Sequence, residues 1–92
     1  MLLLGKPKLH ELVQVYPGSK AWASGWASEV ASASWKQAAD ILNQFPRVKE
    51  IQHGNFAFPV GDLAIDVVII VAFPQGIAVV QDWINRDSFH GH

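Results

Sequence analysis

Arg86 and His90 are the residues of this 92-residue chain best suited to chemistry on a phosphate. A guanidinium binds phosphate oxygens, and an imidazole can give or take a proton near neutral pH. Cleavage of a phosphate ester needs a base, an acid and cations that offset the charge growing on the phosphate. Both residues are therefore catalytic candidates. The alternative is that His90 belongs to an exposed C-terminal tail without a chemical role.

Four other side chains are candidates for binding a substrate. Lys36, Arg47 and Lys49 could contact the phosphates of a substrate, and Trp83 could stack on a base or anchor a protein partner. The six cations of residues 1–50 are scattered along the chain, so a solvated surface is the alternative for most of them. His90 and His92 have the spacing of two metal ligands, but two ligands on a terminal segment do not predict a metal site.

Asp66 is the most informative single residue, because it interrupts an apolar strand pattern. A buried carboxylate without a partner costs several kcal/mol or is neutralised. Asp66 is therefore expected either to face an open cleft on the sheet or to pair with a cation such as Arg86. Pairing with Arg86 would be a structural role.

The composition is that of a single globular domain spanning residues 1–92. Hydrophobic residues make up 50% of the chain and aromatic residues 11%, which excludes a disordered protein. The chain has no cysteine, which excludes a disulfide scaffold and a thiolate metal site. The longest apolar run, Val67 to Phe73, is far shorter than the roughly 20 residues of a transmembrane helix. With no targeting signal recognised, the sequence predicts a cytoplasmic protein that does not enter the membrane.

Charge is low and unevenly distributed. Only 16% of the residues are charged and the net charge is −1, which argues against a general nucleic-acid binder. Residues 1–50 hold six bases and four acids, whereas residues 51–92 hold one base and four acids. An anionic partner should therefore prefer the N-terminal half of the chain.

The hydrophobic period changes from helical to extended half-way along the chain. Three helices are predicted between Pro7 and Phe45, the third starting after Ser34, and strands are predicted at 2–4, 55–60, 63–73 and 77–84. The segment 63–73 is apolar on both faces, which is typical of a central strand covered on both sides. Helices followed by a strand meander indicate an α+β domain in which N-terminal helices pack on one face of a small antiparallel sheet.

The segment WASEVASASWKQAADILNQFP carries the most specific pattern in the chain. The marker residues are Trp26, Glu29-Val30, Ala33, Trp35-Lys36, Asp40 and Gln44-Phe45-Pro46, followed by Asn55, Phe58, Val60-Gly61 and Val67-Val68. With these residues at these intervals, nearly the whole chain resembles the HigB family of the RelE-like toxins. These toxins are mRNA interferases of bacterial type II toxin–antitoxin systems.

The resemblance implies a RelE-like fold and a ribosome-associated mRNA endoribonuclease that needs no cofactor or metal and is inhibited by a cognate helix-turn-helix antitoxin. The matching active-site positions depart from the family pattern. Asp66 stands in place of an arginine, Arg86 in place of a histidine and Phe89 in place of a tyrosine. Arg86 and His90 remain as candidate catalytic groups, so cleavage is expected to be weak or lost. A catalytically inactive protein-interaction module of the same fold is the alternative function.

Overall fold

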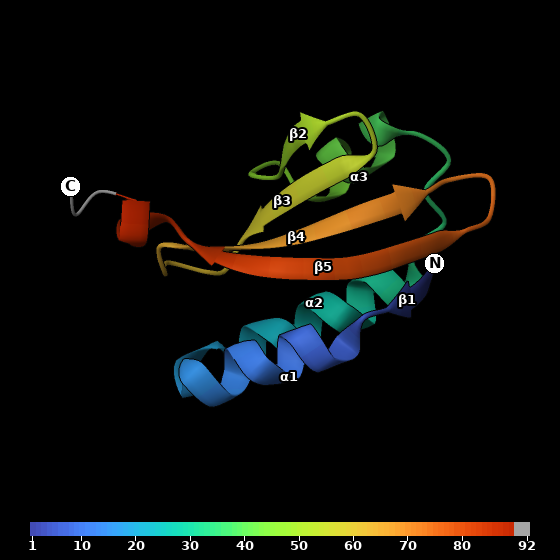
Figure 1. Cartoon of the computed structure of the whole chain (residues 1–92). Coiled ribbons are helices and arrows are strands. Elements are labelled where there is room, and N and C mark those ends of the chain that lie inside the picture. The colour runs from blue at the N-terminus through green and yellow to red at the C-terminus, as the bar shows by residue number, and fades with distance from the viewer. Residues whose placement is uncertain (90–92) are drawn as a thin grey trace.

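Within residues 1–89, which the structure describes, three α-helices pack against a five-stranded sheet (Figure 1). The coordinates are a computed structural model, in which Ser88 and Phe89 are described by their backbone alone. In chain order the elements are β1 (Leu2–Leu4), α1 (Lys6–Val15), the 3-10 turn η1 (Pro17–Ser19), α2 (Lys20–Ser32), α3 (Ala38–Gln44), β2 (Lys49–Gln52), β3 (Asn55–Pro59), β4 (Ile65–Ala72), β5 (Ile77–Asn85) and the 3-10 turn η2 (Arg86–Phe89). The predicted α+β class is confirmed.

The strand order is β1-β5-β4-β3-β2, so the apolar segment that forms β4 lies at the centre of the sheet, as predicted. Strands β2 to β5 pair antiparallel with their neighbours. Strand β1 instead pairs parallel with β5, so the sheet is mixed. Nearly the whole chain separates these two strands, and no hairpin forces them to run antiparallel. The sequence pattern does not predict β2, because all four of its residues are exposed.

A β-bulge in β5 decides which way the end of that strand faces. Val68 pairs with Asp82 while Ile69 pairs with Val80, so Gln81 is an extra residue without a partner on β4. Side chains alternate between the two faces of a strand, and one extra residue reverses the alternation beyond it. Trp83 consequently shares a face with Val67, on the side covered by helices.

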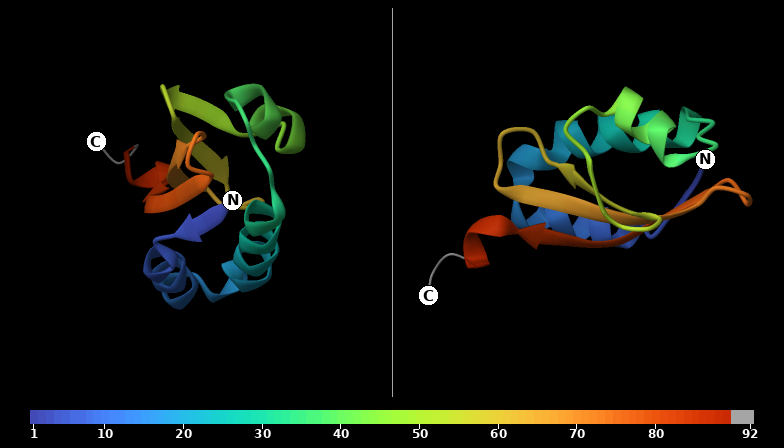
Figure 2. Two further views of the ribbon diagram at one scale, coloured as in Figure 1. Left: turned by 90° about the vertical axis from the view of Figure 1, so that its right-hand side faces the viewer. Right: turned by 90° about the horizontal axis from the view of Figure 1, so that it is seen from above.

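The helices cover one face of the sheet, and the other face carries none within the described residues (Figure 2). In β4 the odd-numbered side chains from Ile65 to Val71 face the helices and are buried. Ile70 lies on the opposite face and is 39% exposed. The prediction that both faces of this strand are covered is therefore wrong at Ile70, although Val68 is buried between its neighbours.

Gly5 turns the chain from β1 into α1 at the edge of the sheet. Its φ of 79° lies in the left-handed region, and a Cβ at this position would lie 2.3 Å from the carbonyl oxygen of Val80. Only glycine combines this conformation with such a close approach. Helix α1 then runs beside the second half of β5, where β1 no longer covers the edge (Figure 1).

The core lies between the sheet and the helices and is rich in aromatic rings. Phe58 on β3 contacts Trp26 of α2 edge-on, with ring centroids 5.3 Å apart, and contacts Phe45 at 5.0 Å. On α3, Ile41 is the residue buried in this core, whereas its neighbour Leu42 is exposed. Helix α3 begins later than predicted, at Ala38. Before it, the backbone N–H of Lys36 donates to the Asp40 carboxylate.

Candidate functional site

Arg86 is held by an ion pair at the end of β5. Its guanidinium lies 3.0 Å from Oδ1 of Asp66 and also donates to the carbonyl oxygen of Leu63. The Asp66 side chain is only 17% exposed, so its charge needs this partner. The predicted pairing of Asp66 with Arg86 is confirmed. One guanidinium nitrogen thus holds Asp66 at the start of β4 and another holds Leu63 in the β3–β4 turn, which is a structural role.

Trp83 lies on the helix-covered side of the sheet. Its ring meets Tyr16 edge-on at 5.8 Å, and its indole N–H is buried without an acceptor among the described residues. An indole stacks on a nucleotide base through an exposed ring face. Trp83 is half-buried, so less of its ring face is open to a base than if its side chain were fully exposed.

Tyr16, at the C-terminus of α1, is a polar group that the sequence pattern does not single out. Its hydroxyl accepts a hydrogen bond of 2.8 Å from Nδ2 of Asn85. Tyr16 is the single tyrosine of the chain, which is the one sequence signal that points to it. Its hydroxyl lies on the helix side of the sheet, whereas Arg86 pairs with Asp66 on the other side, so the two do not form one acid–base site.

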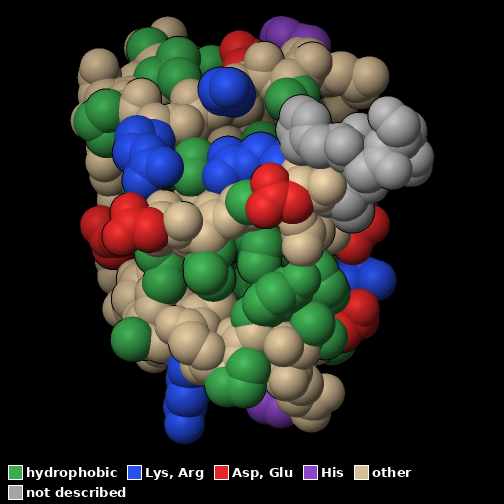
Figure 3. Space-filling view, turned by 90° about the vertical axis from the view of Figure 1, so that its left-hand side faces the viewer, with side chains coloured by type: hydrophobic (Ala, Val, Ile, Leu, Met, Phe, Trp, Pro, Cys, Tyr) green, Lys and Arg blue, Asp and Glu red, His purple; other side chains and the backbone are tan. Residues whose placement is uncertain are grey.

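The three candidate phosphate-binding cations do not form one cluster. Lys36 lies beside the β4–β5 turn, whereas Arg47 donates to the carbonyl oxygen of Gly61 in the β3–β4 turn at the opposite end of the sheet. Lys49 lies on the edge strand β2 opposite Ala57. Figure 3 shows the end of the molecule at the β3–β4 turn, where Lys and Arg side chains gather above an area of hydrophobic side chains.

The histidines of the chain add no described reactive group to the β3–β4 end of the sheet. His90, the second catalytic candidate, lies outside the described residues. His10 on α1 and His53 in the β2–β3 turn are exposed. Across the described part of the chain, no three His, Asp or Glu side chains gather as ligands for a metal ion. The same residues contain no helix that is both long enough and apolar enough to cross a bilayer.

The open face of the sheet carries an unusual group of exposed apolar side chains. Leu2 is 59% exposed and Leu4 43% exposed on β1, and Ile70 lies two strands away on β4. The partly buried Ile77 and Val79 of β5 lie between them, because Leu2 pairs with Ile77 and both Leu4 and Ile70 pair with Val79. We call these five residues the open apolar face.

Two segments that carry the family resemblance meet at a hollow at the β3–β4 end. Gln44, Phe45 and Arg47 approach it from the link between α3 and β2, and Phe58 and Gly61 line it from the end of β3. Neither the protein-family models nor the curated proteins compared with this chain give a match.

Proposed function

We propose that this chain is a HigB-like, RelE-type protein of the cytoplasm that acts by binding a protein partner, with mRNA cleavage weak or lost. The observation that carries the proposal is the open apolar face. Large apolar side chains that gather on a sheet face without a helix over it are typical of a surface that another protein covers. The expected partner is an antitoxin of the helix-turn-helix type.

The contacts of Arg86 support the loss of cleavage. A ribonuclease must place uncompensated cations around a phosphate that gains negative charge in the transition state. Arg86 instead lies against the Asp66 carboxylate, which offsets its charge and would repel a phosphate. Tyr16, the single tyrosine of the chain, is hydrogen-bonded to Asn85 on the other side of the sheet. Acid–base groups are typically worth about 10²- to 10⁴-fold each, so their absence leaves a slow enzyme.

Partner binding is tested by co-purifying the chain with the product of the adjacent helix-turn-helix gene. We expect a stable complex with the parent chain and its loss on Ile70→Lys, which places a charge on the β4 side of the open apolar face. Val15→Lys is the matched control, because Val15 is an exposed aliphatic residue on α1, away from this face. A complex that survives Ile70→Lys as well as Val15→Lys would overturn the proposed role of the face.

Cleavage is tested on ribosomes that translate a defined mRNA, with primer extension to locate the ends. We expect slow or undetectable cleavage by the parent chain and no growth arrest when it is expressed. Any residual activity should be abolished by Arg86→Ala or His90→Ala, and Asp66→Asn should increase it by releasing Arg86. Rapid cleavage that none of these substitutions changes would show that the chain is an active endoribonuclease with a different site.

A further inference from the structure

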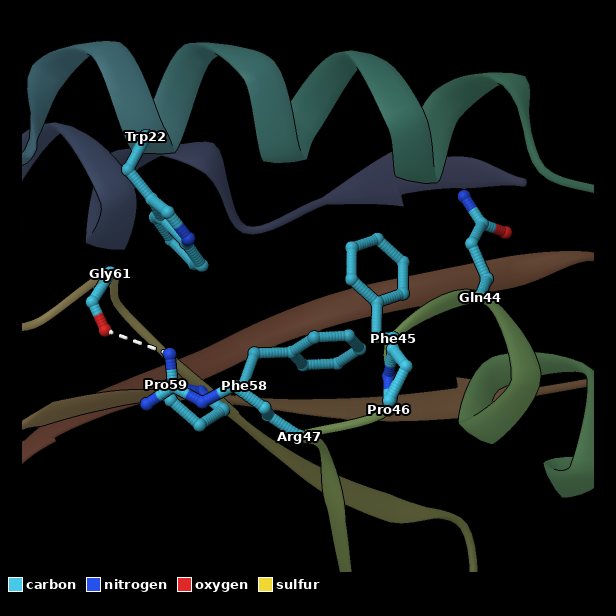
Figure 4. Close-up of a pocket in the computed structure, with 8 residues that line it drawn as sticks. All are labelled: Trp22, Gln44, Phe45, Pro46, Arg47, Phe58, Pro59 and Gly61. Atoms are coloured by element: carbon cyan, nitrogen blue, oxygen red, sulfur yellow. Dashed lines mark hydrogen bonds between the residues drawn. The ribbon is translucent and has the colours of Figure 1, made fainter.

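The hollow at the β3–β4 end is a small aromatic pocket with a cation on its rim. Trp22 of α2, Phe45 and Phe58 form its walls, and Arg47 runs along its edge to the carbonyl oxygen of Gly61 (Figure 4). Its volume is about 190 Å³. Pockets for drug-sized ligands are typically about 300–1,000 Å³, so this pocket has room for one large side chain.

The polar side chains around this pocket present donors. An indole N–H can only donate, so the bond from Nε1 of Trp35 at 2.9 Å must fall on Oε1 of Gln44. The Gln44 amide nitrogen is then on the side nearer Phe45, as Figure 4 shows. The Trp22 indole nitrogen has no acceptor among the described residues, and Arg47 uses one N–H on Gly61. The one side-chain oxygen among the described lining residues is therefore already taken by Trp35.

This arrangement favours a ligand that combines an apolar group with a negatively charged hydrogen-bond acceptor. The aromatic walls favour a flat or branched apolar group, and the free N–H groups of Arg47 suit a carboxylate, which a guanidinium can bind through two parallel hydrogen bonds. A neutral acceptor would form a weaker hydrogen bond with the guanidinium than a carboxylate would.

The size and charge of the pocket favour a protein segment over RNA. RNA brings a series of phosphates, whereas Arg47 is the one cation among the described residues that line the pocket itself. A free aromatic acid in so small and open a pocket would keep much of its surface in water. A peptide can place one side chain in the pocket and continue over the surface beside it.

We infer that this pocket binds a segment of a protein partner in which a large apolar side chain lies next to a carboxylate. Arg47 holds the carboxylate, and Trp22, Phe45 and Phe58 hold the apolar side chain. The inference goes beyond the proposed function, because the pocket lies on the helix side of the sheet and does not include the open apolar face. A partner could therefore use either surface without the other.

The test is an NMR titration of the ¹⁵N-labelled chain with capped tetrapeptides. The probe peptide contains phenylalanine followed by glutamate, and two matched peptides replace the glutamate by glutamine or the phenylalanine by alanine. We expect the Trp22 indole N–H signal to shift with the probe peptide, while the buried N–H of Trp83, whose ring contacts Tyr16 outside the pocket, stays in place. Binding should weaken about tenfold with either matched peptide, since one loses the charged hydrogen bond to Arg47 and the other loses the burial of the aromatic ring.

Two variants localise the interaction. Arg47→Gln should weaken binding of the probe peptide about tenfold, which corresponds to about 1.4 kcal/mol. Lys49→Gln removes a cation two positions away on β2, outside the pocket, and should change affinity less than about twofold. The spectrum of each variant reports directly whether it is folded.

Several results would overturn the inference. Equal binding of the glutamate and glutamine peptides would remove the role of Arg47. Equal affinity for free 3-phenylpropionate would mean that the pocket takes small acids rather than a protein segment. Binding of adenosine monophosphate in preference to the probe peptide would indicate a nucleotide site. None of these results bears on the complex lost by Ile70→Lys, so failure here is distinct from failure of the proposed function.

Discussion

The guanidinium of Arg86 and the carboxylate of Asp66 lie 3.0 Å apart on the face of the sheet that no described helix covers. The pair joins the end of β5 to the start of β4, and Arg86 also donates to Leu63 in the turn before β4. The residue with the chemistry to bind a phosphate is thereby used to fix the β3–β4 turn. We expect this contact to stabilise the domain and to keep Arg86 from binding a phosphate.

Removing Arg86 should destabilise the domain measurably. We expect Arg86→Ala to lower the free energy of unfolding by about 1–2 kcal/mol, because it leaves the mostly buried Asp66 carboxylate without its charged partner. In a double-mutant cycle with Asp66→Asn, urea denaturation should give a coupling energy of about 1 kcal/mol. Lys8→Ala is the control, since the pairs of Lys8 with Glu11 and Asp82 are 3.8 and 3.9 Å long and well exposed. It should cost less than about 0.5 kcal/mol.

Gly5 and Gly25 should respond to alanine in opposite directions. Gly5→Ala forces a Cβ against the Val80 carbonyl at a positive φ, so we expect a loss of about 2–4 kcal/mol. Gly25 lies in the middle of α2 with open space around it, and Gly25→Ala should stabilise the domain by about 0.5–1 kcal/mol. Thermal melting followed by circular dichroism measures both. A Gly5→Ala variant as stable as the parent would contradict the close packing of this turn on β5.

Ile69 and Ile70 are adjacent in sequence but face opposite sides of β4, which makes them a matched pair. Ile69 is fully buried under the helices, so Ile69→Thr should cost about 2–3 kcal/mol through lost burial and a hydroxyl placed in the core. Ile70→Thr keeps the β-branched shape on the open apolar face and should cost less than about 1 kcal/mol. Similar losses in urea denaturation would mean that a further element covers the open face.

Trp26 should tolerate phenylalanine far better than alanine. Its indole is buried against Phe58, and its N–H has no acceptor among the described residues. Trp26→Ala leaves a cavity and should cost about 3–5 kcal/mol, enough to unfold a domain of ordinary stability. Trp26→Phe keeps a ring in place and removes the unpaired N–H, so we expect less than half of that loss. Equal losses for the two variants would show that the indole N–H has a partner.

Local patterns in the sequence were sufficient for the fold class and most of the elements. The change from helical to extended periodicity predicted helices followed by strands, and the apolar run of β4 predicted the central strand of the sheet. The interruption of that run by Asp66 predicted a carboxylate in need of a cation, and Arg86 was among the cations named. These features depend on neighbouring residues and on the general cost of burying a charge, so the sequence contains them directly.

Tertiary structure alone decided which surfaces are covered and which side chains meet. The bulge at Gln81 reverses the alternation of β5, and with it Trp83 turns toward the helices and Arg86 toward Asp66. The period of a strand is the same whether or not a helix packs on it, so the apolar face around Ile70 could not be recognised as uncovered. Arg47 and Gly61 are far apart in sequence, and they meet at the aromatic pocket because the sheet register brings the β3–β4 turn beside the end of α3. Register and coverage are set by long-range packing, which no local pattern encodes.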